Sequence, residues 1–233
     1  MLALHAMMVA DAIVVPSHSM VDPIEMVRRR LRFLPDSPVH VVSHGRPAWQ
    51  APDQRPLQVP MRLFLPGIAS WTKNIPFMAR VLEANRTGGG PALHLTITAT
   101  GSEVIDGSHL ATAFADVMDS VSFIGVRPRD ELPHLYAEHD VVVFPSLVES
   151  FGHPPLEAMT MGMPVVASDR SWAREVCKDG ALYADPKDPG EWVDALRRIH
   201  NSGRRENDAG QMRALAFDWD RAAEDYAELL LAT

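Results

Sequence analysis

The stretch that decides the fold is DVVVFPSLVESFGHPPLEAMTMGMPVVAS, residues 140–168. It places a continuous apolar run, VVVF, before a loop that contains a glycine and two prolines, and a second apolar run, PVVA, after that loop. A strand that is apolar on both sides belongs in a parallel sheet whose two faces are both covered by helices. The stretch therefore predicts two buried strands joined by a loop and a short helix.

The rest of the chain repeats this alternation of short apolar runs and amphipathic segments of helical length. Strands are predicted at residues 12–15, 38–42, 62–65, 92–99, 121–124, 140–144, 164–167 and 181–183. Helices are predicted at residues 23–33, 75–86, 108–118, 129–137, 155–161 and 189–201. The alternation predicts an α/β fold with a doubly wound, Rossmann-like parallel sheet.

A proline-rich segment divides this series into parts. Residues 46–60 contain four prolines and little periodicity, so they are predicted to be a linker. Residues 1–45 hold one strand–helix–strand unit, and residues 61–205 hold enough strands for a complete doubly wound domain. Residues 206–233 are predicted to be a helical tail, with a last helix that starts near Trp219 and has one apolar face that must dock on a neighbour.

Composition limits the class of protein. The chain has 233 residues, of which 46% are hydrophobic, so a packed core is expected. The formal net charge of -8 argues against a general nucleic-acid binder but leaves room for a local basic pocket. The single cysteine, Cys177, excludes an intrachain disulfide and a four-cysteine metal site. No apolar run reaches the roughly 18–20 residues that span a bilayer, and the N-terminus, which holds Asp11, lacks the basic start of a signal peptide.

The loop after VVVF carries the candidate chemistry, because ligands of doubly wound sheets lie beyond the carboxyl ends of the strands. Gly152 allows a ligand to approach closely, and Pro154 and Pro155 suit a first helical turn whose free N–H groups favour a phosphate. Glu149 is predicted on the loop and Glu157 on that first turn, facing the same crevice, where a carboxylate can accept hydrogen bonds from ribose hydroxyls. Each residue alone also has a plainer interpretation: a solvated charge at 149, an ordinary turn at 152, and a complement to the helix dipole at 157.

The same stretch is similar to the signature of the group 1 (family four) retaining glycosyltransferases, which have the GT-B fold. That signature is a glutamate, then Phe-Gly, then a second glutamate eight positions after the first, then Ala-Met, a glycine and Pro-Val, and every position matches here. The resemblance extends to FIGVRPRDELPHLYAEHD (123–140), EVCKDGALYADPKDPGEWVDALRRI (175–199) and FDWDRAAEDYAELL (217–230). It covers nearly the whole chain but only the C-terminal half of the two-domain family enzyme, which makes residues 1–45 a remnant of the N-terminal domain.

The resemblance implies a site for a nucleotide-diphospho-sugar donor, used for retaining transfer to an acceptor without a metal or cofactor. The implied catalytic residues are Glu149, beside the donor sugar, and Lys73, the cation for the diphosphate. The implied donor-binding residues are Gly67, Lys73, Val126, Arg127, Glu149, Ser150, Phe151, Gly152, His153, Leu156 and Glu157.

One position departs from the family pattern. The family has an arginine after the glycine of the first loop, and this chain has Ile68. Losing one charge-assisted hydrogen bond costs roughly 1.5–3 kcal/mol. Arg127 or Arg129 could partly replace it, although both also suit solvated loop charges. His18 and His44 are candidates by position alone for an N-domain histidine that the family places near the sugar, and Cys177, on a short helix, is expected to be inert.

These expectations leave alternatives open. The chain could be a truncated product or one chain of a split enzyme that needs a separate N-terminal domain chain, and alone it is expected to bind a nucleoside diphosphate but to turn over little. It could instead be a non-catalytic nucleotide-sugar-binding module, or a nucleotide-sugar epimerase of the same fold. The acceptor, whether sugar, lipid or glycan, is not defined. No nucleic acid and no transmembrane segment is expected. Nucleotide sugars are made in the cytoplasm, so cytoplasmic residence is expected, with peripheral attachment to a membrane left open.

Overall fold

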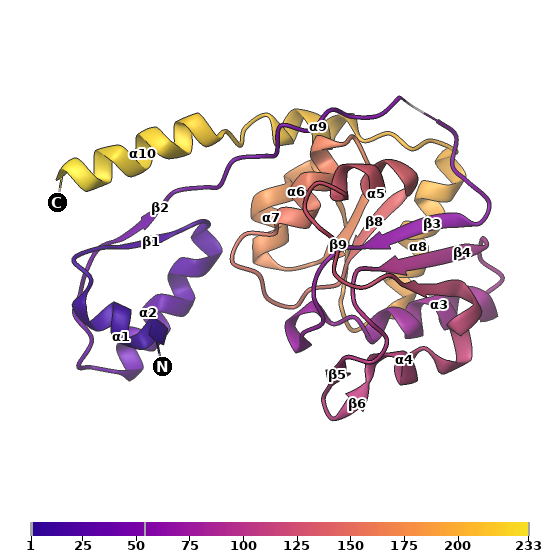
Figure 1. Ribbon diagram of the computed structural model, residues 1–233, viewed down its shortest axis with the longest axis horizontal. Coiled ribbons are helices and arrows are strands. Elements are labelled where there is room, and N and C mark those ends of the chain that lie inside the picture. The colour runs from indigo at the N-terminus through magenta and orange to yellow at the C-terminus, as the bar shows by residue number, and fades with distance from the viewer. Residues whose placement is uncertain (1, 54, 233) are drawn as a thin grey trace.

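The larger part of the protein is a six-stranded parallel sheet covered by helices. The computed structural model describes residues 2–53 and 55–232, and Figure 1 shows the sheet surrounded by helices. The strand order is β10-β9-β8-β3-β4-β7, and all neighbours are parallel. The strands are β3 (Met61–Leu65), β4 (Leu93–Ile97), β7 (Val121–Phe123), β8 (Val141–Phe144), β9 (Val165–Ser168) and β10 (Leu182–Ala184). The predicted α/β, doubly wound, Rossmann-like fold is confirmed.

The order of the strands reverses between β3 and β8, which are hydrogen-bonded neighbours with Leu63 opposite Val141. From β3 the chain adds β4 and β7 on one side, then returns and adds β8, β9 and β10 on the other. Such a reversal separates the loops that follow the two central strands and leaves a crevice at their carboxyl ends. The loops after β3 and β8 are therefore the place where a ligand of this fold is expected.

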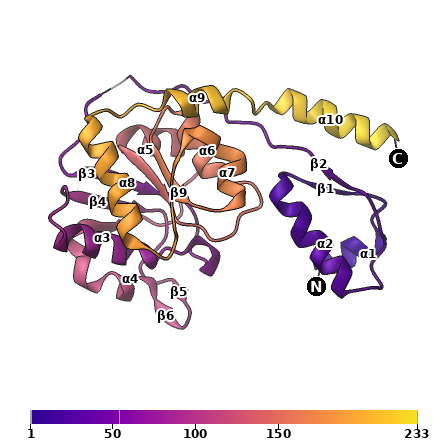
Figure 2. The ribbon, with the colours of Figure 1, turned by 180° about the vertical axis from the view of Figure 1, so that it is seen from behind.

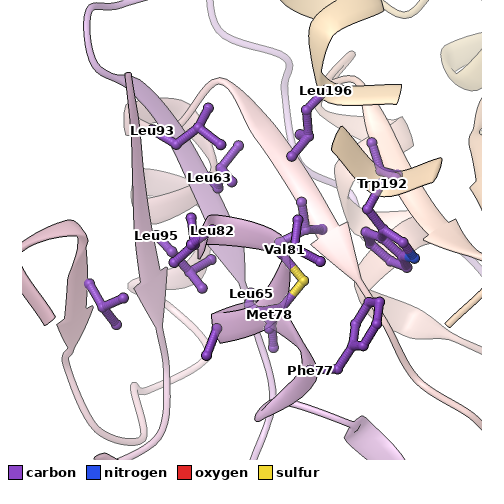
Figure 3. Close-up of a cluster of buried hydrophobic side chains, with 14 of the residues drawn as sticks. Leu63, Leu65, Phe77, Met78, Val81, Leu82, Leu93, Leu95, Trp192 and Leu196 are labelled. Atoms are coloured by element: carbon purple, nitrogen blue, oxygen red, sulfur yellow. The ribbon is translucent and has the colours of Figure 1, made fainter. Parts of the chain in front are cut away.

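Alternate residues of β3 point into two different cores, because side chains of a strand alternate between faces. Leu63 and Leu65 pack with α3 (Phe77–Thr87) and α8 (Pro189–Ser202), and Figure 3 shows this cluster. Phe64 belongs to the core on the other face. The helices on that face are α5 (Leu132–Glu138), α6 (His153–Thr160), α7 (Ser171–Cys177) and α9 (Asp208–Ala214). The continuous apolar strands thus have helices on both faces, as their sequence predicts.

A smaller N-terminal unit, residues 2–45, lies beside the sheet (Figures 1 and 2). It contains α1 (Leu2–Val9), β1 (Ile13–Val15), α2 (Val21–Arg30) and β2 (Val39–Val41), and β1 pairs with β2 in parallel. The last helix, α10 (Trp219–Ala232), extends along this unit, and of its described side chains only Ala222 is buried. The predicted strand–helix–strand unit is present. Within the described residues, no helix is both long and apolar enough to cross a membrane.

The single helix predicted at residues 108–118 is present only in part. Its first two residues form β6 (Ser108–His109), which pairs in a hairpin with the preceding β5 (Val104–Ile105). The short α4 (Leu110–Ala113) and a 3₁₀ helix, Ala115–Ser120, follow. Asp106 and Gly107 form the turn between the strands with φ of 51° and 82°. An Asp-Gly pair favours a tight hairpin turn, and this turn places Ser108 and His109 in a strand, so that the helix begins only at Leu110.

Candidate functional site

The loops after β3 and β8 meet in an ion pair. Nζ of Lys73 lies 2.6 Å from Oε1 of Glu149, and the two side chains are only 16% and 14% exposed. Lys73 also lies 4.7 Å from the ring centroid of Phe144, the last residue of β8. The N–H of Leu147 donates to the carbonyl oxygen of Thr72 over 2.7 Å and fastens one loop to the other. The two residues predicted to be catalytic are therefore side by side at the point where the strand order reverses.

Gly67 completes this corner of the site. Its φ of 139° is one that side-chain-bearing residues rarely adopt, and a Cβ there would lie 3.5 Å from the Lys73 side chain. The glycine therefore lets the β3 loop turn directly against Lys73. A cavity of about 320 Å³ opens beside the pair, lined by Asn74, Pro76, Phe77, Arg80, Leu147, Pro186 and Lys187.

The predicted turn and helix after Glu149 are also present. Gly152 has φ of 101° and ψ of 57° and precedes the first residue of α6, and α6 has a proline in its first turn. The helix ends at Thr160, before Gly162 and Pro164, as predicted. Its first turn therefore opens toward the Glu149 loop, with the positive end of the helix dipole.

Glu157 lies on the second turn of α6, and its predicted place on the first turn is wrong. The left-handed Gly152 lets the helix begin at His153, one residue before the two prolines, which makes Glu157 the fifth helical residue. The residue is 4% exposed. Its Oε2 accepts a hydrogen bond of 2.8 Å from the Tyr136 hydroxyl, and its Oε1 lies 3.6 Å from Nη1 of Arg129.

Burial raises the pKa of Glu157, and the Tyr136 hydrogen bond and the Arg129 charge act in the opposite direction. Burial is the larger effect because it removes the water that would solvate the charged form. Glu157 is therefore a carboxylate whose charge depends on its two neighbours.

The other predicted donor-binding residues lie in different places. Leu156 is fully buried in the core that contains Phe64 and β8, and its N–H donates to the carbonyl oxygen of Gly152. Val126 is an exposed loop residue, and Arg127 forms an ion pair of 3.7 Å with Glu131 in its own segment. Of the two arginines, Arg129 is the one that reaches Glu157. The prediction that the backbone of residues 125–127 meets a base stays a prediction.

Three further predicted residues contact the N-terminal unit. The carbonyl oxygen of Ser150 accepts a 2.6 Å hydrogen bond from the buried Ser17 hydroxyl. Nε2 of His153 lies 2.9 Å from Nδ1 of His44. Phe151 is buried and its ring contacts both His44 and Phe217.

The N-terminal unit therefore touches the same loop that carries Glu149. Both carboxylate oxygens of Glu175, on α7, accept the N–H groups of His18 and Ser19, over 2.7 and 2.9 Å. The ring of His44 stacks at 5.5 Å on Trp219, at the start of α10. Sequence reasoning did not find Ser17, Glu175, Tyr136 or this role of Trp219, because each acts through a partner far away in the chain.

His153 gives the site a testable pH dependence. Burial, followed by the charges of His44 and Arg129, lowers its pKa from 6.5 to about 4. The unfolded chain therefore takes up the proton first as the pH falls, so the free energy of unfolding decreases between roughly pH 6.5 and pH 4. We expect His153→Gln to lose less stability than the wild type between pH 7 and pH 5, measured by urea unfolding at each pH.

The matched control for this measurement is His200→Gln, an exposed histidine on α8. It should lose as much stability as the wild type over the same pH interval. Equal losses in the wild type and in His153→Gln would contradict the assigned role of His153.

Cys177 is buried, and burial raises the pKa of its thiol to about 12. It stays in its uncharged form at neutral pH and lies in the core rather than at the crevice. Within residues 2–53 and 55–232, no three His, Cys, Asp or Glu side chains come together in a way that could hold a metal ion.

The comparisons with solved structures support the fold. Sucrose-phosphate synthase from Thermosynechococcus elongatus superposes with a TM-score of 0.72 at 22% identity, over 99% of this chain and 61% of that one. TarM superposes with a TM-score of 0.74 at 15% identity, over 98% of this chain and 45% of that one. The six-stranded parallel sheet with helices on both faces matches these neighbours and is an α/β, Rossmann-like fold of the GT-B kind.

The sequence comparisons place the chain in a family. The family described as Glycosyl transferases group 1 matches residues 69–213, and the chain belongs to it. A D-inositol 3-phosphate glycosyltransferase of Salinispora arenicola is 31% identical over 211 residues, which are 88% of this chain and 43% of that protein. The O-antigen chain mannosyltransferase RfbU of Salmonella typhimurium is 39% identical over 84 residues, 36% of this chain and 24% of that protein. The matched stretches thus span less than half the length of these relatives.

Proposed function

We propose that this protein binds a nucleotide-diphospho-sugar in the crevice between the β3 and β8 loops, as the donor half of a glycosyltransferase. The observation that carries the proposal is the Lys73–Glu149 pair at the switch point of the sheet, with Glu157 on the adjoining helix. Family membership and relatives that are named glycosyltransferases support it. The reaction proposed is transfer to an acceptor with retention of configuration and without a metal.

Each charged group has one role in this proposal. The leaving nucleoside diphosphate gains negative charge as its bond to the sugar breaks, and a fixed cation beside it lowers the barrier. Lys73 supplies this cation, and Glu149 holds it across the crevice while facing the donor sugar. Glu157 accepts hydrogen bonds from the ribose. The first turn of α6 adds the partial positive charge of its N-terminus.

The acceptor side of the reaction is also part of the proposal. The described N-terminal unit contributes two strands, β1 and β2, and meets the β8 loop through Ser17. We propose that a separate N-terminal domain chain contributes to acceptor binding.

We also propose that the protein works in the cytoplasm, where nucleotide sugars are made.

A second candidate function is a nucleotide-sugar-binding module without catalysis. The observation that favours it is Ile68, an apolar side chain that is 62% exposed where the family has an arginine. A module of this kind would bind the donor and show no transfer or donor hydrolysis, whatever acceptor domain is added.

Calorimetry with uridine, guanosine and adenosine diphosphates tests donor binding. We expect at least one of them to bind to the whole chain, and Glu157→Gln to weaken that binding about tenfold, because a charge-assisted hydrogen bond to the ribose becomes a neutral one. The matched control is Glu83→Gln. Glu83 is an exposed residue of α3, which covers the other face of the sheet from α6, and this variant should bind like the wild type. A folded wild-type sample that shows no heat with any of the three nucleotides would refute the proposed function.

A further inference from the structure

The Glu157 carboxylate is held by side chains that lie outside the glycosyltransferase signature motif. Its two oxygens have different surroundings: Oε2 accepts from the Tyr136 hydroxyl at 2.8 Å, and Oε1 faces Arg129 at 3.6 Å. Oε2 thus contacts a buried hydrogen-bond donor, and Oε1 lies near an exposed cation.

Tyr136 has little freedom to move. It is fully buried, and its ring contacts Phe64 edge-on at 5.2 Å and Trp49 at 5.6 Å. Its carbonyl oxygen accepts a 2.8 Å hydrogen bond from the buried Arg205. Its hydroxyl also lies 3.3 Å from the carbonyl oxygen of Pro154, so Tyr136 is anchored at both ends and its O–H points at Glu157.

Arg129 is the exposed member of the set. Its side chain is 68% exposed and its guanidinium carbon lies 5.7 Å from the ring centroid of Trp49. Trp49 therefore contacts both partners of Glu157, and it belongs to the segment that joins the N-terminal unit to the sheet.

We propose that Tyr136 and Arg129 are positioning residues that hold the Glu157 carboxylate charged, with Oε1 turned toward the ribose hydroxyls of the donor. Tyr136 fixes the carboxylate from the core, and Arg129 attracts the outer oxygen at the rim. This inference rests on the proposed function, because it assigns Glu157 to the ribose. It goes further in naming two residues that decide whether Glu157 can act.

The electrostatics agree with this geometry. Burial raises the pKa of Glu157, and the Tyr136 hydrogen bond and the Arg129 charge each lower it. Burial raises the pKa of Tyr136, so its hydroxyl keeps the proton that it donates. The elements β8, β9, α7 and α9 also pack against α6. Among the described residues, those elements bring no charged group that alters the Glu157 pKa.

The first test compares a ribonucleoside diphosphate with its 2′,3′-dideoxy form in calorimetry, using whichever of the uridine, guanosine and adenosine compounds binds the wild type best. We expect Tyr136→Phe and Arg129→Gln each to weaken binding of the ribonucleotide about fivefold or more, and of the dideoxynucleotide less than twofold, since only the former has hydroxyls for Glu157. The matched control is Tyr183→Phe, which removes a hydroxyl that donates to the backbone oxygens of Ala173 and Lys178. It should change the affinity for neither nucleotide. Equal weakening for both nucleotides would overturn the inference, because a general loss of structure does not distinguish them.

The second test needs no nucleotide. Carbon NMR of the Glu157 carboxyl in the whole chain, titrated with acid, should show a higher pKa in Tyr136→Phe and in Arg129→Gln than in the wild type. Because Arg129 lies at the surface, its variant should fold even where Tyr136→Phe does not. An unchanged pKa in Arg129→Gln would overturn the inference. A shifted pKa in a chain that binds none of the three nucleotides would refute the ribose assignment and the proposed function while leaving the electrostatic coupling supported.

Discussion

Replacing Lys73 with alanine is expected to weaken binding of the nucleoside diphosphate about a hundredfold. Lys73 is a largely buried cation at the switch point, and it forms an ion pair with Glu149 at 2.6 Å. The substitution removes a charge-assisted contact to the diphosphate, worth roughly 1.5–3 kcal/mol. It also leaves Glu149 without its cation, so that a carboxylate then faces the negatively charged phosphates. The measurement is calorimetry with the nucleotide that binds the wild type best.

The double variant Lys73→Ala/Glu149→Gln separates the loss of the contact to the diphosphate from the repulsion by Glu149. With Glu149→Gln added to Lys73→Ala, the repulsion disappears and part of the affinity should return, so that the two substitutions are not additive. Lys178→Ala removes an exposed lysine that precedes the edge strand β10, two strands away from β8, and this variant should bind like the wild type. A Lys73→Ala protein that keeps wild-type affinity would mean that Lys73 does not contact the diphosphate.

The family resemblance named Lys73 and Glu149 as site residues, and the topology of the sheet explains why the two side chains meet. Two loops that follow the central strands of a doubly wound sheet must lie side by side, however far apart they are in the chain. The strands themselves were predictable because runs such as VVVF are apolar on both sides, which a sheet with two covered faces requires. The start of the helix predicted at residues 108–118 was wrong for a local reason. The Asp106–Gly107 turn is a hairpin signal, which a search for helical periodicity does not detect.

The partners of Glu157 could not be predicted in the same way. Tyr136 lies 21 positions before Glu157, on a helix whose apolar pattern gives a tyrosine the role of an ordinary core residue. Trp49 belongs to a segment with little periodicity, and Ser17 reaches Ser150 across 133 positions. Contacts of this kind depend on how helices and linkers pack around the sheet, and no local sequence pattern encodes that packing. Placing Glu157 on the correct turn likewise depends on one backbone angle, at Gly152.

Gly152 is also the position where a single methyl group is expected to cost most stability. Its φ of 101° lies in a region that residues with side chains rarely adopt, and a Cβ there would lie 2.9 Å from the Trp172 ring. Trp172 is buried and packs edge-on against Phe144 at 5.6 Å, so it cannot yield without moving β8. Backbone strain of roughly 1–3 kcal/mol adds to overpacking of roughly 1–3 kcal/mol. We expect Gly152→Ala to lower the free energy of unfolding by about 2–6 kcal/mol in urea titrations.

Gly89→Ala is the control that isolates the two contributions. Gly89 also has a positive φ, 64°, but a Cβ there would meet nothing within 4 Å. Gly89→Ala should therefore lower the free energy of unfolding only by the conformational cost of a positive φ, about 1–2 kcal/mol. The difference between the two variants measures the contact between Gly152 and Trp172. If Gly152→Ala were no less stable than Gly89→Ala, the β8 loop would be free to rearrange. The first turn of α6 would then not be held in the one orientation that the proposed phosphate site requires.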